Sequence, residues 1–341
     1  MVDTIKKNQM ITASPPQPGE LQLIEANLYW LRMPLPMSLD HINLYMIDEG
    51  ESWTLIDTGM KMPETHSYWQ TILTKYCVDK PISRIIVTHM HPDHVGMAGW
   101  LVEQTGASFF MSQAEYLACH AYLGQGIPLS SSIAFYRQCG ASQAYIDHVK
   151  KFQFRLSDII HDLPLTFSRL KAGQQLKLGN SMFKIITGEG HTFEHACLYS
   201  ETKKWLLAGD QVLPNITPNV SVNAHSPDAS PLHGWFESLD QLSELDEDTL
   251  VLPAHNKPFY GLHDRVAAIK QHHQEQLDLL YNSCSEAKTV FELLEVLFKR
   301  KIHFHEMPLA IGECRAHLNH LVETNRLVMN LSEGVCFYQN C

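Results

Sequence analysis

Three histidines and one aspartate fall within the six-residue segment His89-Met90-His91-Pro92-Asp93-His94. Imidazole nitrogens and carboxylate oxygens together are ligands that suit zinc, iron or manganese. Further residues of the same kinds follow along the chain at His191, Asp210 and His255. A histidine-rich surface turn would not require these later residues, so the ordered set predicts a site for two metal ions.

The elements around this segment are suited to position it. The apolar run 84–88 before it predicts a buried strand, and residues 95–102 after it predict the start of a helix. A strand end that turns directly into a helix can direct several side chains into one crevice. Asp210 and His255 also follow apolar runs, at 205–209 and 249–253, so we expect them at strand ends too.

These motifs resemble those of the metallo-beta-lactamase superfamily, over residues 21–262. That family has a His-x-His-x-Asp-His segment, then a Gly-His-Thr turn, an aspartate at a strand end and a Pro-Gly-His-like turn, preceded by Asp-Thr-Gly. The matching segments here are 89–94, Gly190-His191-Thr192, Ala208-Gly209-Asp210, Pro253-Ala254-His255 and Asp57-Thr58-Gly59. Two departures, Ala254 for glycine and Phe193-Glu194-His195 for Pro-Gly-His, remove no ligand.

The resemblance implies a role for each matched residue. The first ion is expected on His89, His91 and His191, the second on Asp93, His94 and His255, with Asp210 bridging the two. The implied cofactors are two divalent ions, with zinc expected and iron or manganese as alternatives. Asp93 is also expected to hold a metal-bound hydroxide and carry a proton. Asp57 and His195 are expected to orient ligand imidazoles, and for His195 a purely structural role is an equal alternative.

The family implies an α+β fold, a four-layer αββα sandwich, for residues 21–262. Alternating and apolar runs predict strands, and a helix begins at Pro63 and ends at Cys77. Residues 1–20, which contain several prolines, predict a flexible tail. After Ser112 the pattern is helical to about Leu170, and this aromatic-rich segment, 113–170, is interpreted as a lid over an apolar acyl pocket. A surface embellishment is the alternative. The predicted strands lie at 27–35, 42–47, 53–56, 107–111, 175–178, 182–187, 196–199, 205–209 and 249–253.

From residue 263 to 341 the pattern changes to three helices and a hairpin. The helices are expected at 263–285, 290–298 and 309–323, and the hairpin strands at 326–329 and 335–338. This order is typical of a winged helix, and a subgroup of the superfamily with such a module includes lactamase-like endoribonucleases.

The charge of this module argues against nucleic acid as a partner. Residues 271–341 hold six Lys or Arg against nine Asp or Glu, and the third helix has only Arg315 to offer a phosphate. Apolar residues on that helix predict a face packed against protein: Leu309, Ile311, Ala316, Leu318 and Leu321. We therefore expect a stabilising role, or one in a homodimer.

Composition places few further limits on function. The chain has 341 residues, a net charge of −11, 45% hydrophobic and 18% charged residues, which is ordinary for a globular enzyme. No apolar run reaches the roughly 18 residues of a membrane span. Scattered cysteines and an N-terminus unlike a secretory signal predict a cytoplasmic protein without a membrane partner.

The resulting hypothesis is a metal-dependent hydrolase that cleaves an ester, thioester or lactone by attack of metal-bound hydroxide. Hydroxyacylglutathione hydrolase-like and lactonase-like activities belong to this class, and the partner is then a small acyl substrate. A single-strand endoribonuclease and a nonenzymatic regulator are the alternatives. The acidic balance disfavours the first, and the intact ligand set disfavours the second.

Overall fold

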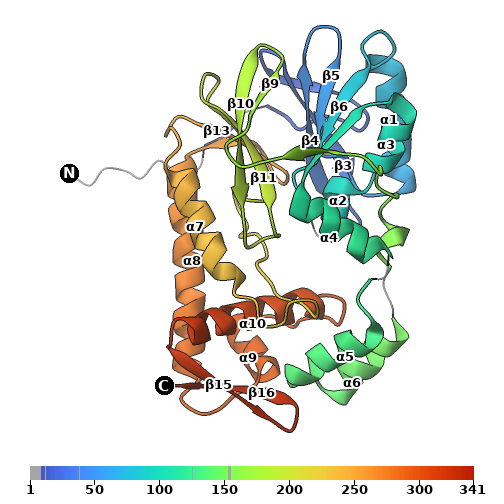
Figure 1. The fold of residues 1–341 in the computed structure, drawn as a ribbon. Coiled ribbons are helices and arrows are strands. Elements are labelled where there is room, and N and C mark those ends of the chain that lie inside the picture. The colour runs from blue at the N-terminus through green and yellow to red at the C-terminus, as the bar shows by residue number, and fades with distance from the viewer. Residues whose placement is uncertain (1–8, 12, 38, 125, 153–154) are drawn as a thin grey trace, which may run out of the picture.

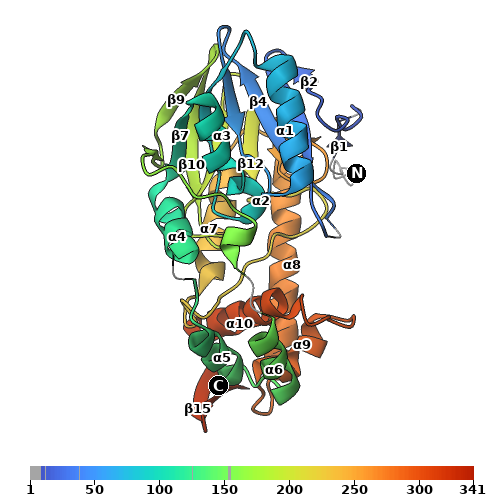
Figure 2. The same cartoon turned by 90° about the vertical axis from the view of Figure 1, so that its right-hand side faces the viewer.

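The computed structural model describes residues 9–11, 13–37, 39–124, 126–152 and 155–341. Two mixed sheets pack face to face, helices cover their outer faces, and a smaller module with a hairpin lies at one end (Figures 1 and 2). This confirms the predicted α+β sandwich with a small C-terminal domain. The winged-helix interpretation of that domain stays a prediction.

Each large sheet contains seven strands within the described residues. One sheet has the order β2-β3-β4-β5-β6-β7-β8, with strands Gln22–Glu25, Leu28–Pro34, His41–Asp48, Trp53–Ile56, Ile82–Ile86, Ser108–Ser112 and Ser168–Leu170. The other has the order β1-β14-β13-β12-β11-β10-β9, with strands Gln9–Met10, Phe259–Tyr260, Leu250–Pro253, Trp205–Gly209, His195–Ser200, Ser181–Gly188 and Gln175–Leu178.

Three apolar layers hold the sandwich together. Between the sheets, inward-facing side chains such as Trp30, Phe183 and Trp205 form the central layer. Outside the first sheet, α1 (Pro63–Tyr76), α2 (Pro92–Val95) and α3 (Ala98–Thr105) contribute to a second layer. Outside the other sheet, α7 (Pro231–Ser243) and α8 (Leu262–Ser283) contribute to a third. Two sheets with helices on both sides give the four layers expected.

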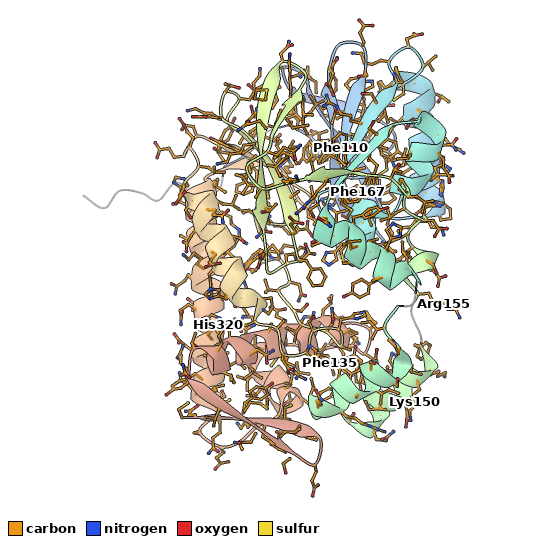
Figure 3. The ribbon with its side chains drawn as sticks, viewed as in Figure 1. Phe110, Phe135, Lys150, Arg155, Phe167 and His320 are labelled. Atoms are coloured by element: carbon orange, nitrogen blue, oxygen red, sulfur yellow. The ribbon has the colours of Figure 1, made fainter. Side chains whose placement is uncertain are left out.

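The predicted 113–170 lid divides between two parts of the molecule. Helix α4 (Gln113–Gly124) packs on the sandwich, where Tyr116 stacks on Phe167 at 3.8 Å between ring centroids. Phe167 is labelled in Figure 3, on the segment that leads into β8. Helices α5 (Leu129–Gln138) and α6 (Gln143–Lys151) instead join the cluster of the C-terminal module. A short 3₁₀ turn, η1 (Leu156–Asp158), follows. The helical pattern expected to run to Leu170 is wrong at its end, because β8 pairs with β7 as the last strand of the sheet.

The C-terminal module contains α9 (Val290–Leu297), α10 (Met307–Glu323) and the hairpin β15 (Leu327–Ser332) and β16 (Val335–Asn340). It shares one continuous core with α5, α7 and α8, so it is joined to the rest of the chain by packing. Four of the five apolar residues predicted to pack on α10 are buried. The exception is Leu309, which is 60% exposed.

The expected flexible tail does not extend to all of residues 1–20. Residues 9 and 10 form β1, and Ile11 donates its backbone N–H to Pro258, so this segment belongs to a sheet edge. Residues 1–8 and 12 lie outside the described ranges. Throughout the described ranges, every helix is too short or too polar to cross a bilayer.

Candidate metal centre

Seven side chains from four loops meet where β6, β10, β12 and β13 end. The turn after β6 contributes His89 and His91, and α2 contributes the next two residues of the motif. His191 lies between β10 and β11, Asp210 follows β12 directly, and His255 follows β13. The structure thus brings together every ligand predicted from the sequence.

The side chains fall into two groups that can each hold a metal ion. His89, His91, His191 and Asp210 present ligand atoms within 4.8 Å of one another, and so do Asp93, His94 and His255. The Asp210 carboxylate faces both groups. Its Oδ2 lies 3.3 Å from His191 Nε2, and its Oδ1 lies 3.5 Å from His94 Nε2 and 3.4 Å from His255 Nε2. One carboxylate oxygen toward each group is the arrangement that a bridging ligand requires.

Three imidazoles are oriented by acceptors on their outer nitrogens. His191 Nδ1 donates to the carbonyl of Asn219 at 2.8 Å, and His255 Nδ1 donates to the carbonyl of His41 at 2.9 Å. His94 Nδ1 lies 2.8 Å from Asp57 Oδ2. Carbonyl and carboxylate oxygens only accept, so each Nδ1 carries a proton and each Nε2 points inward, where its lone pair can bind a cation once that nitrogen is unprotonated.

The chemistry of the centre fits divalent cations. His94 Nε2, His191 Nε2 and Asp210 Oδ1 are buried, and none has a hydrogen-bond partner. Buried polar atoms without partners are costly, and a cation shared among them would remove that cost. The donor set of imidazoles and carboxylates suits zinc, iron or manganese and does not distinguish among them.

The two groups differ in their protonation. Burial, together with the neighbouring His191, lowers the pKa of His91 to about 3, so that ring stays neutral. Burial would lower the pKa of His255 as well, but Asp210 and Asp93 outweigh it and raise that pKa to about 10. The pKa of His94 is also raised, because Asp57, Asp210 and Asp93 outweigh the effect of burial. A cation must therefore displace protons from the second group.

Asp57 and Thr88 form a buried support behind the ligands. The Asp57 carboxylate accepts the backbone N–H of Thr88 at 2.8 Å while its other oxygen faces His94. The Thr88 hydroxyl lies 3.0 Å from His89 Nδ1. Asp57 thus orients a ligand imidazole, as expected for it, whereas Thr88 was missed because a threonine at a strand end carries no distinctive signal.

His195 lies behind the centre, fully buried. Its ring stacks on that of His89 at 4.7 Å, and its Nε2 accepts the backbone N–H of Asp210 at 3.1 Å. Burial holds its pKa well below the usual value, so Nε2 remains an acceptor. The contact therefore positions the backbone of the bridging aspartate, where the sequence led us to expect a hydrogen bond to a ligand imidazole.

Glu115 of α4, which the sequence did not single out, joins two ligand loops. This buried carboxylate accepts the backbone N–H of Met90 at 2.9 Å and that of Glu194 at 2.8 Å. Glu194 in turn accepts the N–H of Ala114. The departure from Pro-Gly-His at residues 193–195 therefore gives a reciprocal link between the His191 loop and the start of α4.

Asn43 fixes the turn that carries His255. Its amide donates to the carbonyls of Pro253 and Asn256, and its oxygen accepts from Trp30 and Arg32. All four bonds are available because a side-chain amide both donates and accepts. A single asparagine thus anchors a ligand turn to the opposite sheet.

Comparison with known proteins identifies the family. Residues 37–255 match the model of the metallo-beta-lactamase superfamily, and residues 277–341 match a metallo-beta-lactamase-like C-terminal domain. The chain belongs to the metallo-beta-lactamase superfamily. Among solved structures, this superfamily member is similar to a beta-lactamase domain protein from Burkholderia ambifaria, with 32% identity, a TM-score of 0.91 and 98% of each chain covered.

Two curated proteins also match. A probable metallo-hydrolase of Bacillus subtilis, YqjP, is 23% identical over 334 residues, which is 90% of this chain and 96% of that protein. The atrochrysone carboxyl ACP thioesterase dmxR1 of a Cryptosporiopsis species is 20% identical over 212 residues, 61% of this chain and 47% of that protein. The protein is a metallo-hydrolase of this superfamily.

Proposed function

We propose that this metallo-hydrolase cleaves an acyl thioester, or the related ester or lactone, with two metal ions bound in the centre. The observation that carries the proposal is the Asp210 carboxylate, whose two oxygens face the two ligand groups. Two ions bound there would activate water and polarise an acyl carbonyl.

Asp93 is the residue we assign to proton transfer. Its side chain is 17% exposed, against 10% for Asp210 and 4% for His255, so it is more open to a substrate than either. Its Oδ2 lies 3.4 Å from His255 Nε2. A carboxylate that ligates through one oxygen keeps the other free to accept a proton from water and pass it to a leaving group.

An acyl substrate is favoured by apolar side chains on the ligand loops. Phe193 and Ile216 are 46% and 42% exposed, and both lie on loops that carry or orient a ligand. Phe193 is two residues from His191, and Ile216 belongs to the loop after Asp210. Exposed apolar groups beside a polar centre suit a hydrocarbon chain next to a reacting carbonyl. The thioesterase name of the fungal relative supports thioesters first.

Nucleic acid is a less suitable substrate for this molecule. Arg315, the one basic residue of the third helix of the module, is only 1% exposed. Its guanidinium lies over the ring of Phe135, which Figure 3 labels on α5. Its guanidinium also lies 3.3 Å from Asp228. A cation held by packing and an ion pair is not available to bind a phosphate backbone.

That the protein forms a homodimer stays a prediction.

The test is a metal count followed by a substrate panel. We expect close to two transition-metal ions per chain by elemental analysis, and hydrolysis of acyl thioesters that varies with chain length. Asp93→Ala should abolish the activity, whereas Asp79→Ala, at an exposed carboxylate in the turn before β6, should not change it. A metallated protein that cleaves single-stranded RNA or a phosphodiester, but no thioester, ester or lactone, would overturn the proposal.

A further inference from the structure

Helix α10 of the C-terminal module lies directly against the loop that follows the bridging aspartate. The backbone N–H of Val222 donates to the carbonyl of Gly312 at 3.2 Å. A Cβ atom at Gly312 would lie 2.5 Å from the carbonyl oxygen of Val222 and 2.8 Å from Ser221 Cβ. A residue larger than glycine would therefore force the helix away from the loop. The backbones of α10 and of the loop are therefore in close contact at Gly312.

The residue after that glycine reaches the metal centre through one intermediate. Glu313 Oε2 accepts the side-chain amide of Asn219 at 2.9 Å, and the backbone carbonyl of Asn219 accepts His191 Nδ1 at 2.8 Å. The Ser221 hydroxyl donates to Asn219 Oδ1, so both ends of the Asn219 amide are held. Two hydrogen bonds therefore separate a carboxylate of α10 from a ligand imidazole.

We propose that Glu313 is a positioning residue for the first metal group, acting through Asn219, and that α10 thereby forms part of the metal centre. The inference rests on the metal-binding part of the proposed function and is independent of the substrate. A carbonyl that holds His191 Nδ1 sets both the tautomer and the direction of Nε2. Its position depends on the Asn219 side chain, and that side chain depends on Glu313.

The partial burial of Glu313 supports a built contact. Burial raises the pKa of its carboxyl to about 7, while the hydrogen bond from Asn219 acts in the opposite direction. A carboxyl is rarely placed in such surroundings without a role, because removing it from water is costly. The hydrogen bond from Asn219 offsets part of that cost.

The effect should be confined to one of the two groups. His94 is oriented by Asp57, which directly follows β5, and His255 by the carbonyl of His41, which begins β4. Glu313 contacts neither. Weakening the Glu313 contact should therefore reduce metal affinity at the group of His89, His91 and His191 and spare the other, which then serves as an internal control for folding.

The experiment is a zinc titration of the full-length, metal-free protein against a chromophoric chelator, without substrate. Outer partners of metal ligands typically contribute tenfold to a hundredfold to affinity. For Glu313→Leu we expect about a tenfold loss at one site, so that dialysis at a fixed free zinc concentration leaves close to one ion where the wild type keeps two. Glu313→Gln retains an acceptor for Asn219 and should restore the second ion.

Two further variants test the route. Glu323→Leu changes the same helix, and Glu323 also contacts the same loop, through the Ser230 hydroxyl, so it should keep both ions. If Glu313 acts through Asn219, Asn219→Ala combined with Glu313→Leu should lose no more affinity than either variant alone. Wild-type affinity at both sites in Glu313→Leu would overturn the inference. Equal losses at both sites, or the same loss in Glu323→Leu, would overturn it too.

A failure of this inference is distinguishable from a failure of the proposed function. The titration reads zinc binding alone, so a wild-type protein inactive on thioesters would still give a valid result. Conversely, a Glu313→Leu variant that binds two ions normally leaves the thioesterase proposal standing. Cobalt substitution gives a second readout, because the absorption of the ion at the first group should change in Glu313→Leu while that at the second does not.

Discussion

The Asp57→Asn substitution tests how far an outer carboxylate controls a ligand. In the wild type, one oxygen of Asp57 accepts the N–H of Thr88 and the other accepts the Nδ1 proton of His94. Asparagine has one acceptor and one donor in the same positions. If its oxygen stays on Thr88, its NH₂ group faces His94 Nδ1 at about the 2.8 Å of the present contact.

Each way of accommodating the asparagine costs free energy. His94 can change tautomer, which places a proton on Nε2 and removes the lone pair that a metal needs. Alternatively, the amide can rotate, which leaves the buried N–H of Thr88 facing a donor. An unsatisfied buried donor costs about 1–3 kcal/mol. At about 1.4 kcal/mol per factor of ten, that penalty predicts a loss of roughly 5- to 150-fold in affinity.

The assay is a zinc titration of metal-free Asp57→Asn, in which we expect the loss at the group of Asp93, His94 and His255. Asp48→Asn is the matched control, because Asp48 lies on the same sheet but pairs with Lys80, away from the ligands. Its affinities should equal those of the wild type. If Asp57→Asn binds its second ion as tightly as the wild type does, the tautomer argument is refuted.

Two further predictions concern the loops and the protons of the centre. Glu115→Leu leaves the half-buried backbone N–H groups of Met90 and Glu194 without acceptors, so the free energy of unfolding should fall by about 2 kcal/mol in denaturant titrations. In Glu115→Gln, which keeps one acceptor, the free energy of unfolding should fall less. Equal losses in the two variants would contradict the argument. Because the folded pKa of His255 is about 10, zinc binding at pH 8 should release its proton, measured by calorimetry in buffers of different ionisation enthalpy. The same raised pKa stabilises the metal-free fold fully below about pH 6.5 and progressively less as pH rises toward 10, and zinc binding without proton release would refute the assignment.

The ligands were predictable because their placement is local. A strand end followed by a short turn determines where the next few side chains point, and the motif at residues 89–94 contains its own strand, turn and helix start. The predicted bounds of β5 and β12 match the structure for the same reason, since both are short, apolar and bounded by turns. Family resemblance then supplied the order of the remaining ligands.

Short strands and one helix were not predicted. Strands β1, β8 and β14 contain two or three residues, too few for an alternating pattern, and only pairing with distant strands defines them. Helix α7 is a different case. Its buried residues Leu232, Trp235, Leu239 and Leu242 have helical spacing after a proline at the first turn, so the signal was present and was overlooked.

The division of the 113–170 segment between two packing partners shows what a sequence pattern cannot predict. Tyr116 and Phe135 are both buried aromatic residues on helices of this segment, yet one packs on the sandwich and the other on the C-terminal module. An apolar face indicates that a helix is buried and does not indicate against which partner. Whether α4, or α5 with α6, covers a substrate therefore depends on contacts that no local pattern encodes.

Helix α10 shows why the choice of partner matters for function. Within one turn it directs Arg315 toward Phe135 of α5 and Glu313 toward Asn219 of the metal loop. Because both side chains stand on one helix, the placement of α10 is determined jointly by its contact with α5 and by its contact with the loop whose carbonyl orients His191. The same geometry accounts for the burial of the cation that a recognition helix would need on its surface.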